Sequence, residues 1–89
     1  MLFRSNPVRR NLIRVYLERG LYDKALAQLR IFSKAYPVSS LSYELEGDYY
    51  KAVKEPLKAK ESYKKALIFD WRNREIIEKI NNIEVENGK

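Results

Sequence analysis

The chain has 89 residues and a formal net charge of +6, and it contains neither cysteine nor histidine. Its length suits one small domain, and the two missing residue types remove disulfides, thiolate metal ligands and the usual general base of neutral-pH catalysis. No apolar segment has the length of a signal-peptide core or of a membrane span. The sequence therefore predicts a cytoplasmic protein with no enzymatic activity, no cofactor, no metal and no membrane partner.

Helix signals follow one another along the whole chain. Asn6 and Pro7 favour a helix start, because Asn caps helices and Pro fits the first turn. Gly20 is typical of a helix end, Pro37 stops the second helix, and Ser39 can cap the third. Apolar residues at helical spacing complete the pattern. The sequence predicts five helices and no strand, with the helices over residues 7–19, 22–36, 41–53, 56–70 and 74–86.

Residues of similar size and polarity recur 34 positions apart. Tyr16 and Ala25 recur as Tyr50 and Ala59. Few residues are identical at this offset. What recurs is side-chain size, with small or bulky residues at the positions where a helical hairpin needs them. Both alanines are expected to be buried where two helices cross closely.

These positions resemble the tetratricopeptide repeat (TPR) family, whose unit is a 34-residue helix–turn–helix. The resemblance is carried in the first copy by Leu12, Tyr16, Gly20, Tyr22, Ala25, Leu29, Phe32 and Pro37, and in the second by Tyr43, Gly47, Tyr50, Ala59, Tyr63 and Ala66. It implies an all-α fold of antiparallel helix hairpins stacked as a short α-solenoid. The implied divisions are repeat 1 at 6–39, repeat 2 at 40–73, a capping helix at 74–87, and flexible ends at 1–5 and 88–89.

Several positions depart from the family pattern. Lys54 stands at the turn glycine, Glu46 at a leucine, and Ile13 at a small residue. Arg9 replaces a large apolar residue, and Trp71 replaces the terminal proline. A hairpin of this family cannot bury its apolar face alone, so stacked neighbours are expected to complete the core.

The resemblance implies a non-enzymatic protein–protein interaction scaffold. Such arrays hold a peptide or helix of a partner against a concave face formed by the first helix of each repeat. Carried over by spacing, the lining is Arg10, Arg14, Leu17, Glu44, Asp48, Lys51, Glu75, Glu78 and Asn82. Basic residues at one end and acidic residues at the other favour a partner of basic or mixed charge. Alternatively, Arg10 and Arg14 pair with Glu44 and Asp48 and add little stability.

The positive charge suggests a second function. Residues 1–36 hold eight bases and two acids, whereas the rest of the chain is balanced. The alternative is a basic module whose anion patch contacts RNA, DNA or another polyanion through Arg4, Arg9, Arg10 and Arg14. The patch has little aromatic interleaving and no nucleic-acid motif, so nucleic acid is not the expected partner.

A homodimer is a further open alternative. Ile13 and Leu17 are candidates to lie outside the core of their own hairpin. The last helix has more isoleucine and valine than one face can bury, namely Ile76, Ile83 and Val85. The Arg-rich first helix would then meet the Glu-rich last helix of a second copy.

Overall fold

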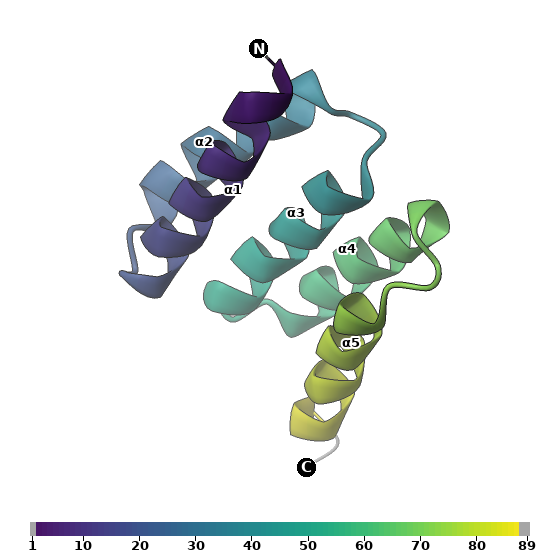
Figure 1. The fold of residues 1–89 in the computed structure, drawn as a ribbon. Coiled ribbons are helices and arrows are strands. Elements are labelled where there is room, and N and C mark those ends of the chain that lie inside the picture. The colour runs from purple at the N-terminus through teal and green to yellow at the C-terminus, as the bar shows by residue number, and fades with distance from the viewer. Residues whose placement is uncertain (1, 88–89) are drawn as a thin grey trace.

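The computed structural model describes the backbone of residues 2–87 and the side chains of residues 9–84. Its elements are the helices α1 (Leu2–Glu18), α2 (Tyr22–Ala35), α3 (Ser40–Ala52), α4 (Pro56–Phe69) and α5 (Arg74–Asn87). Each helix folds back on the one before it, so that the hairpins α1–α2 and α3–α4 stack side by side and α5 follows (Figure 1). Residues 2–87 contain no strand, which confirms the all-α class. No helix among these residues is both long and apolar enough to cross a membrane.

Four of the five helices begin within one residue of the predicted start, and α1 is the exception. It begins at Leu2 instead of Pro7, so the prediction that Asn6 caps it is wrong and residues 2–5 are helical. A proline in the second turn removes one intrahelical hydrogen bond but does not by itself set the start of a helix. The ends predicted as flexible at residues 1 and 88–89 lie outside the described residues.

The turns confirm the 34-residue register. Gly20 and Lys54 both have left-handed backbone conformations, with φ of 74° and 68°. Lys54 therefore keeps the conformation that glycine usually supplies, at a cost in steric strain. The predicted cap of α3 is present, since the side chain of Ser39 accepts a hydrogen bond from the backbone N–H of Ser42 at 3.5 Å. Asn73 caps α5 in the same way, through the N–H of Ile76 at 3.3 Å.

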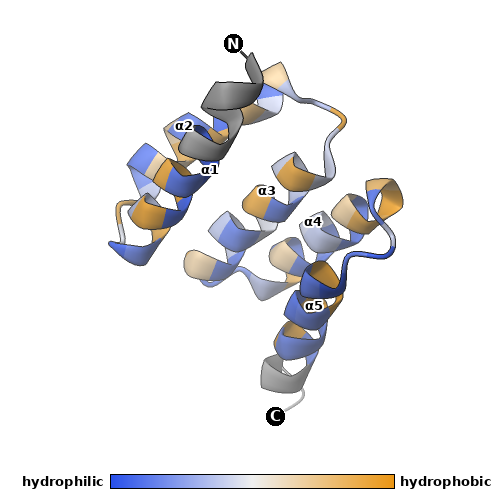
Figure 2. Cartoon of the chain, viewed as in Figure 1, coloured by the Kyte–Doolittle hydropathy of each residue, from blue (hydrophilic) through white to orange (hydrophobic). Residues whose placement is uncertain are grey.

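Two apolar clusters form the core, and α3 lies between them. The first joins α1, α2 and α3 through Ile13, Leu29, Phe32 and Leu45. The second joins α4 and α5 beneath tyrosines of α3, through Ala59, Tyr63, Ala66, Ile76, Ile80 and Ile83. Hydrophobic and hydrophilic residues alternate along each helix (Figure 2), so every helix can face a neighbour and solvent at once. Ala25 and Ala59 are fully buried, as predicted.

The helices α3 and α4 approach each other closely at Gly47. A Cβ atom added there would lie 2.5 Å from ring carbons of Tyr63, so a larger residue cannot fit without movement. At the adjacent positions of the two helices, Glu46 accepts a hydrogen bond from the hydroxyl of Ser62 at 2.8 Å. This bond accounts for the glutamate at a position where the family usually has leucine.

The structure corrects the predicted locations of several isoleucines. Ile13, Ile76 and Ile83 lie inside the clusters, with 0%, 0% and 1% of their surface exposed, so they cannot provide a dimer surface. Ile77 has the helical spacing of an apolar stripe with Ile80, but it is 39% exposed. The reason is rotation: α5 turns Ile76, Ile80 and Ile83 toward α4, which leaves Ile77 at the margin. The side chain of Val85 lies outside the described residues.

Adjacent isoleucines on α5 should differ sharply in their contribution to stability. Ile76→Ala should cost about 2–5 kcal/mol, because it leaves a cavity in the second cluster. Ile77→Ala should cost less than about 1 kcal/mol, as expected for a partly exposed position. Urea unfolding of both variants measures the difference. Equal midpoints would contradict the orientation of α5.

Replacing Lys54 by glycine should relieve the backbone strain of this turn and raise the stability of the fold. Lys54→Gly is expected to stabilise the fold by about 0.5–1 kcal/mol, because glycine adopts positive φ without steric cost. Gly20→Ala tests the same strain in reverse: its Cβ would meet nothing within 4 Å, so only the backbone cost of about 1–2 kcal/mol remains. Thermal unfolding of the two variants should shift in opposite directions. A loss of stability in both would refute this account of the Lys54 turn.

Candidate functional site

A groove runs between α1, α3 and α5 and contains two pockets. The basic pocket has a volume of about 420 Å³ and is lined by Arg14, Leu17, Glu18, Asp48, Lys51, Ala52, Lys54, Tyr63 and Lys79. The mixed pocket is lined by Arg10, Arg14, Ser40, Leu41, Glu44, Asp70, Asn73 and Glu75. Arg14 lines both, so the two pockets are neighbours along one face of the molecule.

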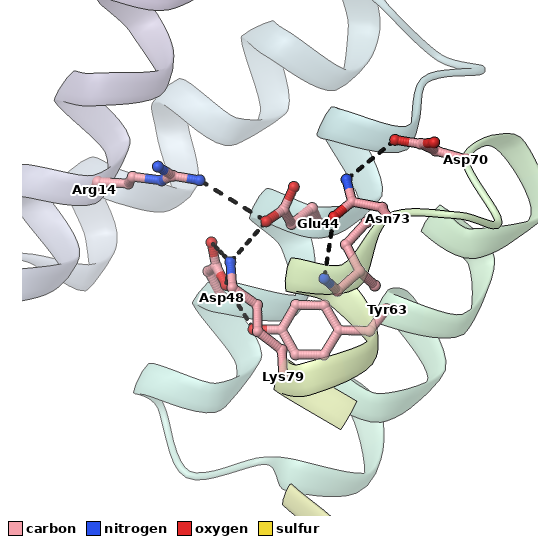
Figure 3. A network of polar contacts seen from close by, with 8 residues as sticks. Arg14, Glu44, Asp48, Tyr63, Asp70, Asn73 and Lys79 are labelled. Atoms are coloured by element: carbon pink, nitrogen blue, oxygen red, sulfur yellow. Dashed lines mark hydrogen bonds and ion pairs between the residues drawn. The ribbon is translucent and has the colours of Figure 1, made fainter. Parts of the chain in front are cut away.

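The floor between the pockets is a network of ion pairs centred on Lys79 (Figure 3). The Lys79 ammonium lies 2.7 Å from Oε2 of Glu44, and 3.1 and 3.3 Å from the carboxylate oxygens of Asp48. The guanidinium of Arg14 reaches the same Glu44 oxygen at 3.9 Å. Glu44 is buried, and a buried carboxylate is tolerated where cations pair with it. The network therefore connects α1, α3 and α5 across the groove.

Tyr63 connects α4 to this network through its contact with Asp48. Its hydroxyl donates a hydrogen bond to Oδ1 of Asp48 at 2.5 Å, and its ring lies 5.7 Å from the Lys79 ammonium. Burial raises the pKa of Tyr63 far above its ordinary value of 10.0, and the negative charge of Asp48 raises it further. Burial opposes the charged form of Lys79, but its hydrogen bond to Glu44 and the charge of Asp48 outweigh burial, so the pKa of Lys79 is raised from 10.5.

The stacked hairpins, the 34-residue register and the groove on the first helices can be compared with known proteins. A family model described as a tetratricopeptide repeat-like domain matches residues 6–85. The chain belongs to this tetratricopeptide repeat-like family. No curated protein matches its sequence.

In this TPR-like domain, seven of the nine residues predicted for the groove line the two pockets. They are Arg10, Arg14, Leu17, Glu44, Asp48, Lys51 and Glu75. Glu78 and Asn82 are exposed on α5 and line neither pocket. The isoleucine stripe fixes the rotation of α5, and at about 100° per residue Glu78 lies nearly opposite that stripe. Lys79 faces the groove in their place, beside the predicted Glu75.

The sequence prediction missed two central groove residues, Lys79 and Tyr63. Lys79 lies 34 residues after Leu45 and is therefore its equivalent in the repeat. Because Leu45 belongs to the first cluster, the repeat predicts an apolar core residue at position 79. A lysine at a core register, with two carboxylates on the neighbouring helix, was a usable signal of a buried ion pair. Tyr63 was assigned to the repeat core, and it is buried there, but its hydroxyl also reaches Asp48.

The arginines of α1 do not all face one way. Arg9 donates a hydrogen bond to the side-chain oxygen of Gln28 on α2. Arg10 and Arg14 line the groove, where Nε of Arg10 is buried without a hydrogen-bond partner among the described side chains. The side chain of Arg4 lies outside the described residues. The arginines predicted as one anion patch therefore divide between the α2 side and the groove.

Alkaline pH should destabilise this TPR-like domain through the network. Tyr63 and Lys79 both hold their protons more tightly in the folded chain than in the unfolded chain, so stability is complete below about pH 10 and falls as pH rises further. Urea midpoints between pH 8 and pH 11.5 should show this decline, with the range chosen around the ordinary pKa values of these groups. Tyr63→Phe should reduce the slope, whereas Tyr22→Phe at an exposed site should not. An unchanged slope in Tyr63→Phe would contradict the role of the network.

Proposed function

We propose that this TPR-like domain binds another protein by holding a peptide or helix of the partner in the groove between α1, α3 and α5. Family membership supports a protein-interaction scaffold in general, and members of the family are generally not enzymes. The observation that carries the proposal is the division of charge between floor and rim. On the floor, the two carboxylates of Glu44 and Asp48 are balanced by the two cations Lys79 and Arg14.

The rim of the groove, which is formed by exposed side chains that line the two pockets, carries charges that take no part in the ion pairs of the floor. Lys51 and Lys54 are exposed beside the basic pocket, and they have no ion-pair partner among the described side chains. At the other end, the exposed side chains of Asp70 and Glu75 border the mixed pocket. Exposed charges of this kind contribute to the choice and orientation of a partner more than to raw affinity.

The rim therefore suits a partner segment of mixed charge. Its acidic side chains would lie toward Lys51 and Lys54, and its basic side chains toward Asp70 and Glu75. Leu17 offers an apolar contact at the basic end, within the lining of the basic pocket. Because the ion pairs already hold the floor in place, little side-chain ordering remains to oppose binding.

A random peptide library displayed on phage and selected on the whole chain tests the proposal. Enriched peptides should combine an acidic end with a basic end. A selected peptide should then bind Lys51→Glu/Lys54→Glu about tenfold more weakly, because the rim charge at that end is reversed. Replacing the acidic residues of the peptide by lysine should restore binding to this variant.

The matched control is Lys24→Glu/Lys34→Glu, which makes the same charge change at exposed positions of α2 outside both pockets. It should bind the selected peptide as the natural chain does. Failure to enrich any peptide, or an equal loss of binding in both double variants, would refute groove binding.

A further inference from the structure

Large apolar side chains project from one edge of the molecule. This turn edge consists of Val38 in the α2–α3 turn, and of Ile68, Phe69 and Trp71 at the end of α4 and in the α4–α5 turn. Val38, Ile68 and Trp71 are 69%, 73% and 68% exposed, which makes them three of the four most exposed large apolar residues described. Both turns follow the second helix of a hairpin, so they lie at the same end of the stack (Figure 1).

The aromatic rings of the turn edge are held by their neighbours. The ring of Phe69 stacks on Tyr43, with centroids 5.8 Å apart and planes within 3° of parallel. The guanidinium of Arg72 lies 4.6 Å from the centre of the Trp71 ring. Several exposed apolar side chains at one end of the stack, bordered by charge, are typical of an interaction surface.

The turn edge lies outside the three pockets described for residues 9–84. None of its four side chains lines the basic pocket, the mixed pocket or the smaller pocket between α2 and α3. A protein partner would therefore have to supply the pocket that receives these side chains. A lipid interface needs no such pocket, because apolar side chains enter it directly.

The charge around the turn edge is positive. The exposed bases of the flanking segments are Lys34, Lys64, Lys65, Arg72 and Arg74. The acids among the same segments are Asp70, which accepts a hydrogen bond from Asn73 at 3.0 Å, and Glu75. Pairing two copies through this edge would bring like charges together, which disfavours a second copy as the occupant. An anionic surface has the complementary charge.

We infer that the turn edge binds the surface of a bilayer containing anionic phospholipids. Ile68, Phe69 and Trp71 enter the boundary between headgroups and acyl chains, where Trp is favoured by its polar N–H and apolar ring. The surrounding lysines and arginines lie among the phosphates. This contact is peripheral, so it agrees with the finding that no described helix could cross a membrane. The sequence-based expectation that no membrane is a partner rested on the lack of a spanning segment, and the proposal departs from it only for peripheral contact.

The orientation leaves part of the groove accessible. The basic pocket is lined by the last turns of α1 and α3, at the opposite end of the helices from the turn edge. With the turn edge on a lipid surface, this pocket lies at the end of the helices that is farther from the bilayer.

The single tryptophan of the chain makes a direct test possible. Adding vesicles of phosphatidylglycerol and phosphatidylcholine to the whole chain should shift Trp71 emission to shorter wavelength and sediment the protein with the lipid. Vesicles of phosphatidylcholine alone should do neither, and added salt should reverse the binding to the anionic vesicles.

Two serine substitutions on α4 separate the turn edge from general apolar exposure. Ile68→Ser should lower partitioning into anionic vesicles about tenfold, because an apolar side chain is lost from the interface. Leu57→Ser is the matched control, since Leu57 is equally exposed, at 72%, at the other end of the same helix. It should change partitioning less than about twofold.

Four outcomes would overturn the inference. The first is the absence of any emission shift or sedimentation with anionic vesicles. The second is an equal loss of partitioning in the two serine variants. The third is an emission shift without lipid that grows with protein concentration, which would show that a second copy covers Trp71. The fourth is a shift with soluble poly-glutamate and none with anionic vesicles, which would indicate an acidic protein partner.

Discussion

The ammonium group of Lys79, held between the carboxylates of Glu44 and Asp48, is the interaction on which the arrangement of this small array depends. It fixes α5 against α3, and through Glu44 it also reaches Arg14 on α1. Tyr63 ties α4 to the same site. Removing one partner from a buried ion pair typically costs about 3–5 kcal/mol, a large part of the roughly 5–10 kcal/mol available to a domain of this size. The last helix therefore completes the fold by charge as well as by apolar contact.

The same network separates the groove into a fixed floor and a rim that can respond to a partner. Floor charges that are already paired give up little on binding, and their positions are set before a partner arrives. The rim charges of Lys51 and Lys54 lie at one end of the groove, and the turn edge lies at the other end of the helices. The basic end of the groove is therefore clear of the turn edge, whereas Asp70 at the acidic end lies in the chain between Phe69 and Trp71, so a lipid surface would leave only the basic end open to a partner.

Much of the architecture follows from local features of the sequence. Helical spacing, with glycine and proline between the helices, predicts five helices because each signal acts within one turn of its own position. The small residues Ala25 and Ala59 mark the close helix crossings. The conformation of Lys54 follows from its place 34 residues after Gly20, because the repeat imposes the same turn whichever residue occupies it.

What the sequence by itself determined was thus the number of helices, their turns, and the faces of α1 and α3 that form the groove. Only the tertiary structure decided the rotation of α5, which turns Lys79 instead of Glu78 and Asn82 toward the groove. The repeat register carries over only where a helix has the same neighbours, and α5 packs its isoleucines on α4 with no following hairpin among residues 2–87. Its rotation therefore depends on the shape of the second cluster and on the charges of α3, which are brought together only when the hairpins have stacked.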